Sequence, residues 1–173
     1  MWVINDPQIV NMKNNENNKY NMKNLNTYIN EKLTIVHKSY SCAPDTTEEL
    51  KEILKERLTN DPNADLNDID VSNIIDMSFL FSGLDPHNID ISKWDVSNTE
   101  DMKFMFNRCE NFNSDLSGWD VSNAEDIYCM FINCKNFDSD ISNWDISNVQ
   151  DMRHMFNGCD SMKKLPTWYV DHH

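Results

Sequence analysis

The sequence predicts an α/β fold, a short right-handed solenoid of about four 25-residue helix-plus-strand repeats with an N-terminal capping helix. Three observations support this. A four-residue motif recurs every 25 residues, each copy has the apolar spacing of a helix, and an amphipathic segment precedes the first copy. A unit of this length cannot bury its apolar face alone, so we expect the copies to stack.

The repeat is visible as columns, by which we mean residues at equivalent positions in successive copies. The motif Asp-Val-Ser-Asn, or Asp-Ile-Ser-Asn in the last copy, begins at Asp70, Asp95, Asp120 and Asp145. Other columns hold Asp76, Asp101, Asp126 and Asp151; Phe81, Phe106, Phe131 and Phe156; Cys109, Cys134 and Cys159; and Trp94, Trp119 and Trp144. So many matched columns predict one continuous core of stacked identical side chains.

The middle of each copy has helical spacing. Apolar residues fall at i, i+3, i+4 and i+7 in the second copy: Met102, Met105, Phe106 and Cys109. Asn98 precedes them as a candidate N-cap, with Asp101 in the first turn. A left-handed residue is predicted to end each helix, at Gly83, Arg108, Asn133 and Gly158. The segment 115–121 is too short for a helix and favours a strand.

The remaining segments flank the repeats. Residues 1–44 are predicted to be an Asn-rich, partly disordered arm, and residues 45–64 an amphipathic capping helix with a linker. The helix would be capped by Asp45 or Thr46 and bury Leu50, Ile53, Leu54 and Leu58. Residues 65–162 form the repeat solenoid. Residues 163–173 are predicted to be a C-terminal cap and tail, in which lysines and a proline protect the last sheet edge.

Charge excludes several functions. The chain carries a net charge of −14, and residues 65–162, with 19 acidic and 5 basic residues, account for it. Such an acidic surface disfavours nucleic-acid binding, and no apolar run is long enough to insert into a membrane. The first residues lack a basic and then apolar signal sequence, so we expect a cytoplasmic or virus-associated protein rather than a secreted one.

No catalytic arrangement is visible. Carboxylates recur in every copy, whereas a catalytic pair is normally a single asymmetric constellation, so the sequence predicts a protein that is not an enzyme and needs no cofactor or metal. The aspartate columns are interpreted as turn and helix caps, with calcium binding as the alternative. The Cys column is interpreted as packed free thiols rather than metal ligands or disulfides, and the Trp column as core rather than a binding platform.

The repeat resembles a known family. The pattern D-[VI]-S-N-x-x-D-M-x-x-M-F-x-x-C, followed by a Trp, is similar to the BspA-like leucine-rich repeats, which also occur in mycoplasma-type surface lipoproteins. The similarity covers about residues 45–165. It implies an α/β solenoid with a role in adhesion or protein interaction, and it supplies no catalytic residues.

The predicted function is therefore a non-enzymatic protein-interaction or adhesion module that presents an acidic repeat surface to a macromolecular partner, a protein in the first instance. The alternatives are a structural or assembly component of a virion or envelope, or a calcium- or carbohydrate-binding module. The predicted contact residues are Phe104, Tyr128 and His154, which vary between copies and stand just before the column of Met105, Met130 and Met155. The oligomeric state is left open.

Overall fold

A computed structural model describes residues 42–169, all within the second of the two units into which the chain divides, Cys42–His173. Most of the predicted N-terminal arm, residues 1–41, lies outside the described residues, as do residues 170–173 of the predicted tail.

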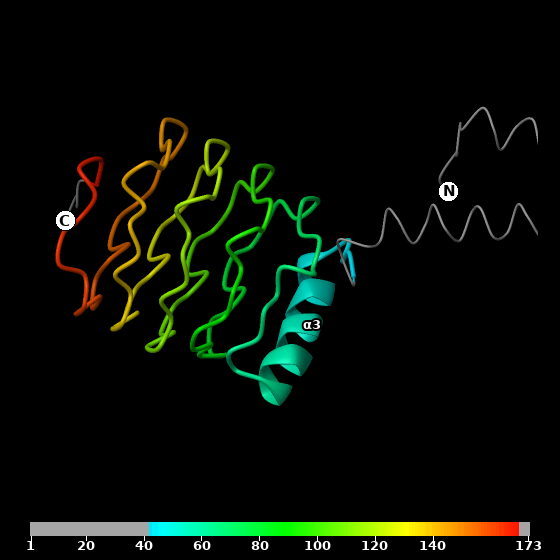
Figure 1. Ribbon diagram of the computed structural model, residues 1–173. Helices are drawn as coiled ribbons and strands as arrows, with labels where there is room; N and C mark the ends of the chain where they lie inside the picture. Colours follow the sequence, from blue (N-terminus) through cyan, green and yellow to red (C-terminus); the bar gives the residue numbers. More distant parts are fainter. Residues whose placement is uncertain (1–41, 170–173) are drawn as a thin grey trace, which may run out of the picture. The chain divides into compact units, whose positions relative to one another are not determined.

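The first element described is helix α3, Thr47–Asn60, which precedes the repeats (Figure 1). The side chain of Thr46 accepts a hydrogen bond from the backbone N–H of Glu49, and a carboxylate oxygen of Glu49 accepts one from the backbone of Asp45. The Thr46 cap fixes the start of α3, as the sequence predicts, and the bond from Asp45 to Glu49 adds to it. The buried face, Leu50, Leu54 and Leu58, joins the core of the repeats, while Ile53 is only partly buried.

The 25-residue copies lie side by side, so that each runs along its neighbour in the same direction (Figure 1). Parallel bridges join equivalent residues, from Asp76 to Asp101, from Asp101 to Asp126 and from Asp126 to Asp151. Backbone hydrogen bonds repeat at the same step; for example, the Phe81 N–H donates to the Met105 carbonyl over 2.8 Å, and the Phe106 N–H to the Met130 carbonyl over 2.9 Å. The copies are therefore held in exact register.

The predicted helix in each copy is not found. The only α-helix among residues 42–169 is α3, and the segments that hold the Met, Phe and Cys columns are successive turns. In the first copy the N–H of Leu80 donates to the carbonyl of Met77, and the N–H of Leu84 donates to the carbonyl of Phe81. Turns of this length, like a helix, return the chain to the same side after three or four residues, so the same apolar spacing serves both.

The predicted strand is also displaced. Within residues 115–121 the chain makes a turn in which the Trp119 N–H donates to the Leu116 carbonyl, and one parallel bridge, from Asp65 to Asp90, lies in the equivalent segment of the first copies. The bridges that join all four copies lie instead along the column of Asp76, where the helix was predicted to start. The predicted N-cap residue Asn98 has a different role. Its side-chain amide donates to the Ser72 carbonyl of the preceding copy over 2.9 Å, and equivalent bonds recur from Asn123 and Asn148. Asparagine therefore joins adjacent copies rather than capping a helix.

The left-handed residues are where the sequence places them. Gly83, Arg108, Asn133 and Gly158 all have positive φ, between 61° and 81°. Each is the third residue of a tight turn rather than the end of a helix, because a type II turn requires positive φ at that position. Glycine and asparagine adopt it at least cost.

Two aromatic columns, both predicted from the sequence, lie in the core. Phe81, Phe106 and Phe131 are fully buried, with successive ring centroids 5.1 and 5.4 Å apart. In the second column, Trp94, Trp119 and Trp144 are no more than 4 % exposed and stack at 6.5 Å. Each of these indoles donates from Nε1 to a carbonyl of the preceding copy, at Leu66, Ile91 and Leu116. The tryptophans are therefore buried structural residues and not a binding platform.

The Cys column is a column of packed free thiols, as predicted. Cys109 and Cys134 are fully buried, and their Sγ atoms lie 3.3 and 2.9 Å from the carbonyls of Phe81 and Phe106 in the copy before. Burial raises the pKa of the Cys109 thiol to about 12 and raises the pKa of Cys134 further. Neither thiol is poised to react as a thiolate.

These thiols should resist labelling in the folded protein. We expect a thiol reagent at pH 8 to modify Cys42 and, more slowly, the half-buried Cys159, whose pKa is raised by burial to about 12. Cys109, Cys134 and the buried Cys129 should react only in denaturant. Mass spectrometry of the labelled peptides checks this, and equal labelling of Cys134 with and without denaturant would contradict it.

Candidate interaction surface

The aspartate columns are mainly structural. Three columns show this, those that begin at Asp70 and Asp76 and a third that holds Asp65, Asp90, Asp115 and Asp140. In each, the carboxylate accepts a hydrogen bond from the backbone N–H two residues later, which is an Asx turn. Examples are Asp95 to Ser97, Asp115 to Ser117 and Asp126 to Tyr128. The turn predicted for the column of Asp95 is confirmed, whereas the column of Asp101 caps turns and not the predicted helix.

The Asx turns make stability depend on pH. Hydrogen bonds from the serine two residues later lower the pKa of four carboxyls, those of Asp115, Asp120, Asp140 and Asp145. A lowered folded pKa gives stability that is present above the unfolded value of about 3.9 and is lost as the pH falls through the folded values. Asp126 opposes this, because burial raises its pKa.

We therefore expect the melting temperature to fall progressively as the pH is lowered from about 5 towards 3, since the carboxyls with lowered pKa outnumber Asp126. Thermal unfolding followed by tryptophan fluorescence at a series of pH values measures this. The Asp126→Asn variant should keep the acid-induced fall, because its amide oxygen preserves the turn. A melting temperature that rises on acidification would contradict the prediction.

An aromatic strip runs across all four copies on the outside of the stack. It consists of Phe79, Phe104, Tyr128 and His154, whose successive ring centroids are 4.8, 5.2 and 5.9 Å apart. Phe79 is 44 % exposed and the other three are half-buried. The structure thus brings together the three predicted contact residues, Phe104, Tyr128 and His154, and adds a fourth.

The strip does not follow a single column. The column of Phe79 and Phe104 continues with Cys129 and His154, and all four residues have φ between 54° and 59°. Tyr128 stands one residue earlier, yet its ring lies between those of Phe104 and His154, while Cys129 turns inward and is buried. Sequence reasoning missed Phe79, although its place 25 residues before Phe104 is a sufficient signal.

Charges line the strip in an alternating pattern. In the second copy Lys103 forms an ion pair with Asp101, and in the fourth Arg153 pairs with Asp151 through two hydrogen bonds of 3.0 and 2.6 Å. In the first and third copies the equivalent positions are Ser78 and Tyr128, so these copies supply no cation to their own aspartate. The guanidinium carbon of Arg153 also lies 5.6 Å from the ring centroid of Tyr128.

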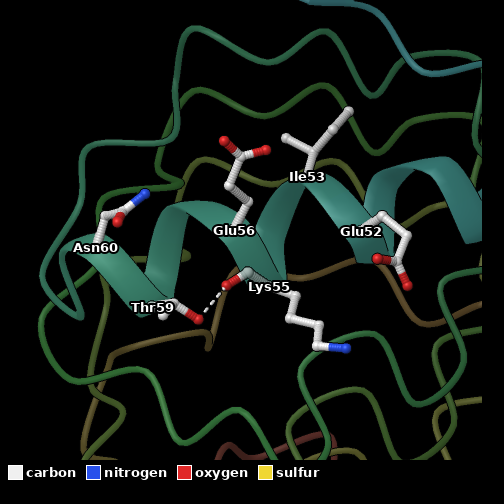
Figure 2. Close-up of a pocket in the computed structure, with 6 residues that line it drawn as sticks. All are labelled: Glu52, Ile53, Lys55, Glu56, Thr59 and Asn60. Atoms are coloured by element: carbon white, nitrogen blue, oxygen red, sulfur yellow. Dashed lines mark hydrogen bonds between the residues drawn. The ribbon is translucent and has the colours of Figure 1, made fainter.

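The hollow along α3 does not bring together a convergent set of reactive groups. This shallow hollow of about 440 Å³ follows α3, where Ile53 and Glu56 point to one side of the helix and Lys55 to the other (Figure 2). Thr59 there donates to the Lys55 carbonyl over 2.6 Å, which is a bond within the helix. Among residues 42–169, no group of three or more His, Cys, Asp or Glu side chains is placed to hold a metal ion. No helix in this part of the chain is long and apolar enough to cross a membrane.

Stacked 25-residue copies with a structural core and a variable outer strip define a repeat protein. The chain belongs to the family described as Mycoplasma protein of unknown function, DUF285, whose pattern matches residues 48–168. This match starts in α3 and ends at Trp168, so the helix and the repeats form one family unit. No curated protein and no solved structure gives a match to the chain.

Proposed function

We propose that this chain is a non-enzymatic interaction module that binds a protein partner through the aromatic strip and its neighbouring carboxylates. The observation that carries the proposal is the continuity of the strip, since four half-exposed or exposed aromatic groups contact one another across four copies. Exposed aromatic side chains are enriched at protein interfaces, because they bury much area at little entropic cost.

Two further features support the proposal. The Asn, Trp and Phe columns make contacts between copies and the Asp columns form turns within each copy, which leaves the variable outer positions for recognition. The resemblance of the repeat to BspA-like leucine-rich repeats also favours an interaction or adhesion role. In this proposal the stack is a short solenoid whose outer side is the working surface.

The partner can be sought with a photo-reactive residue. We would replace Phe104 by p-benzoylphenylalanine, irradiate the full chain in an extract of the cells that produce it, and compare it with the same replacement at the exposed Leu165. We expect a discrete cross-linked protein at position 104 only, displaced by excess unmodified chain but not by the Phe79→Ala/Phe104→Ala variant. Identical products at both positions would overturn the proposal.

A second candidate function is assembly of copies of the chain through the last repeat. Two of its apolar residues, Met152 and Met162, are half-exposed, whereas their equivalents Met102 and Phe112 in an inner copy are buried. The backbone N–H groups of Met152 and Phe156 make no hydrogen bond to the described residues, whereas their equivalents in earlier copies donate to the next copy. A second chain placed end to end would cover this face.

Light scattering across a concentration series tests assembly. We expect a dimer that Met152→Glu dissociates, while Ile75→Glu, a matched change at an exposed apolar residue of the first copy, leaves it intact. A monomer at every concentration would exclude this candidate.

A further inference from the structure

The aromatic strip points to a particular partner chemistry, which deepens the proposed function and rests on it. We propose that the strip binds an extended segment of a partner protein that carries two arginines or lysines three residues apart. These cations would pair with Asp76 and Asp126, the aspartates of the first and third copies.

The two aspartates share a feature that the other members of their column lack. Asp76 is exposed and Asp126 is half-buried, and neither forms an ion pair with a described residue. In the second and fourth copies, by contrast, the residue two positions later is a cation that pairs with its own aspartate. A cation of the same copy therefore neutralises the aspartate in the second and fourth copies. The carboxylates of Asp76 and Asp126 remain to pair with a partner.

The fourth copy shows how an arginine fits this surface. The Arg153 guanidinium directs two N–H groups to the two carboxylate oxygens of Asp151 and places its carbon over the ring of Tyr128. Carboxylate and aromatic ring together recognise the planar, weakly hydrated guanidinium better than either alone. The first copy offers the same pair of groups, since Phe79 stands three residues after Asp76 and is the most exposed ring of the strip.

The geometry of the stack sets the spacing of the cations. Asp76 and Asp126 lie two copies apart in a parallel-bridged column, which corresponds to about 9.6 Å. A polyproline II segment has three residues per turn and rises about 3.1 Å per residue, so its side chains at positions i and i+3 point to the same side about 9.3 Å apart. Cations at these positions therefore match the two carboxylates. The rings of Phe79 and Phe104, stacked at 4.8 Å, would support the aliphatic stems of the cationic side chains between them.

Fluorescence anisotropy with short capped peptides tests this on the full chain. The probe is a fluorescein-labelled serine- and threonine-rich peptide with two arginines three residues apart. One control peptide has the same composition with the arginines adjacent, and another has citrulline in place of both arginines. We expect the spaced peptide to bind about fivefold or more tightly than the adjacent one, and the citrulline peptide not to bind.

Matched variants locate the site. Asp76→Asn/Asp126→Asn should weaken binding of the spaced peptide by about fivefold or more, because both asparagines keep the Asx-turn acceptor but lose the charge. Asp160→Asn, which removes a charge from an exposed residue of another column, should change it by less than about twofold. Phe79→Ala should weaken binding, whereas Leu165→Ala should not.

The outcomes separate this inference from the proposed function. Equal affinity for the two arginine spacings, or an equal loss in Asp160→Asn, would show attraction to net charge alone and overturn the inference. If the cross-linking at position 104 then still identifies a partner, the interaction role stands without the cationic segment. If cross-linking at both positions gives identical products, the proposed function fails, and the inference fails with it.

Discussion

Phe131→Ala should destabilise the protein by about 3–5 kcal/mol, which is a large share of the stability of a domain of this size. The Phe131 side chain is fully buried in the middle of the stack. Its ring contacts those of Phe106, Phe137 and Phe156, at centroid distances of 5.4, 4.1 and 5.9 Å. Truncation opens a cavity that the surrounding structure cannot fill by relaxing, because backbone hydrogen bonds hold each copy to both neighbours.

Urea unfolding followed by tryptophan fluorescence measures the change, since Trp144 lies 6.3 Å from the Phe131 ring. The matched control is Phe79→Ala, which removes the same side chain from a position that is 44 % exposed and should cost less than about 1 kcal/mol. Similar losses in the two variants would contradict the stacked core.

Deleting the whole second copy, residues 95–119, should leave a folded protein with a lower melting temperature. The junction then joins Trp94 to Asp120, which reproduces the natural step from Trp94 to Asp95. The third copy then lies next to the first, and equivalent residues remake each hydrogen bond between neighbouring copies. Stability in such stacks is close to a sum over copies and their interfaces, so one copy and one interface are lost.

A shorter deletion should do more harm. Removing only residues 95–106 would place the Asp and Asn columns of one copy against the Phe and Cys columns of the next, and we expect cooperative unfolding to disappear. Thermal unfolding of the two deletion variants tests this prediction. A stable product from the shorter deletion, or an unfolded one from the in-register deletion, would show that register between copies does not hold the fold together.

The aromatic strip was only partly predictable from the sequence. Phe104, Tyr128 and His154 were predicted as contacts because they vary between copies, and the structure places their rings in one strip. The ring of Tyr128 reaches into the strip from a neighbouring column, while Cys129 turns into the core. Column alignment cannot reveal this, because it records backbone positions and not the reach of side chains.

The sequence by itself determined the 25-residue step, the buried Phe, Trp and Cys columns, the turns that begin at aspartate, and the capped helix α3. These follow from the chemistry of single residues repeated at a fixed interval. Only the tertiary structure decided the backbone within each copy, where turns replace the predicted helix. Apolar residues spaced three and four apart point inward in a helix and in these turns alike. The turns leave alternate backbone N–H and carbonyl groups pointing along the stack, and the neighbouring copies bind them.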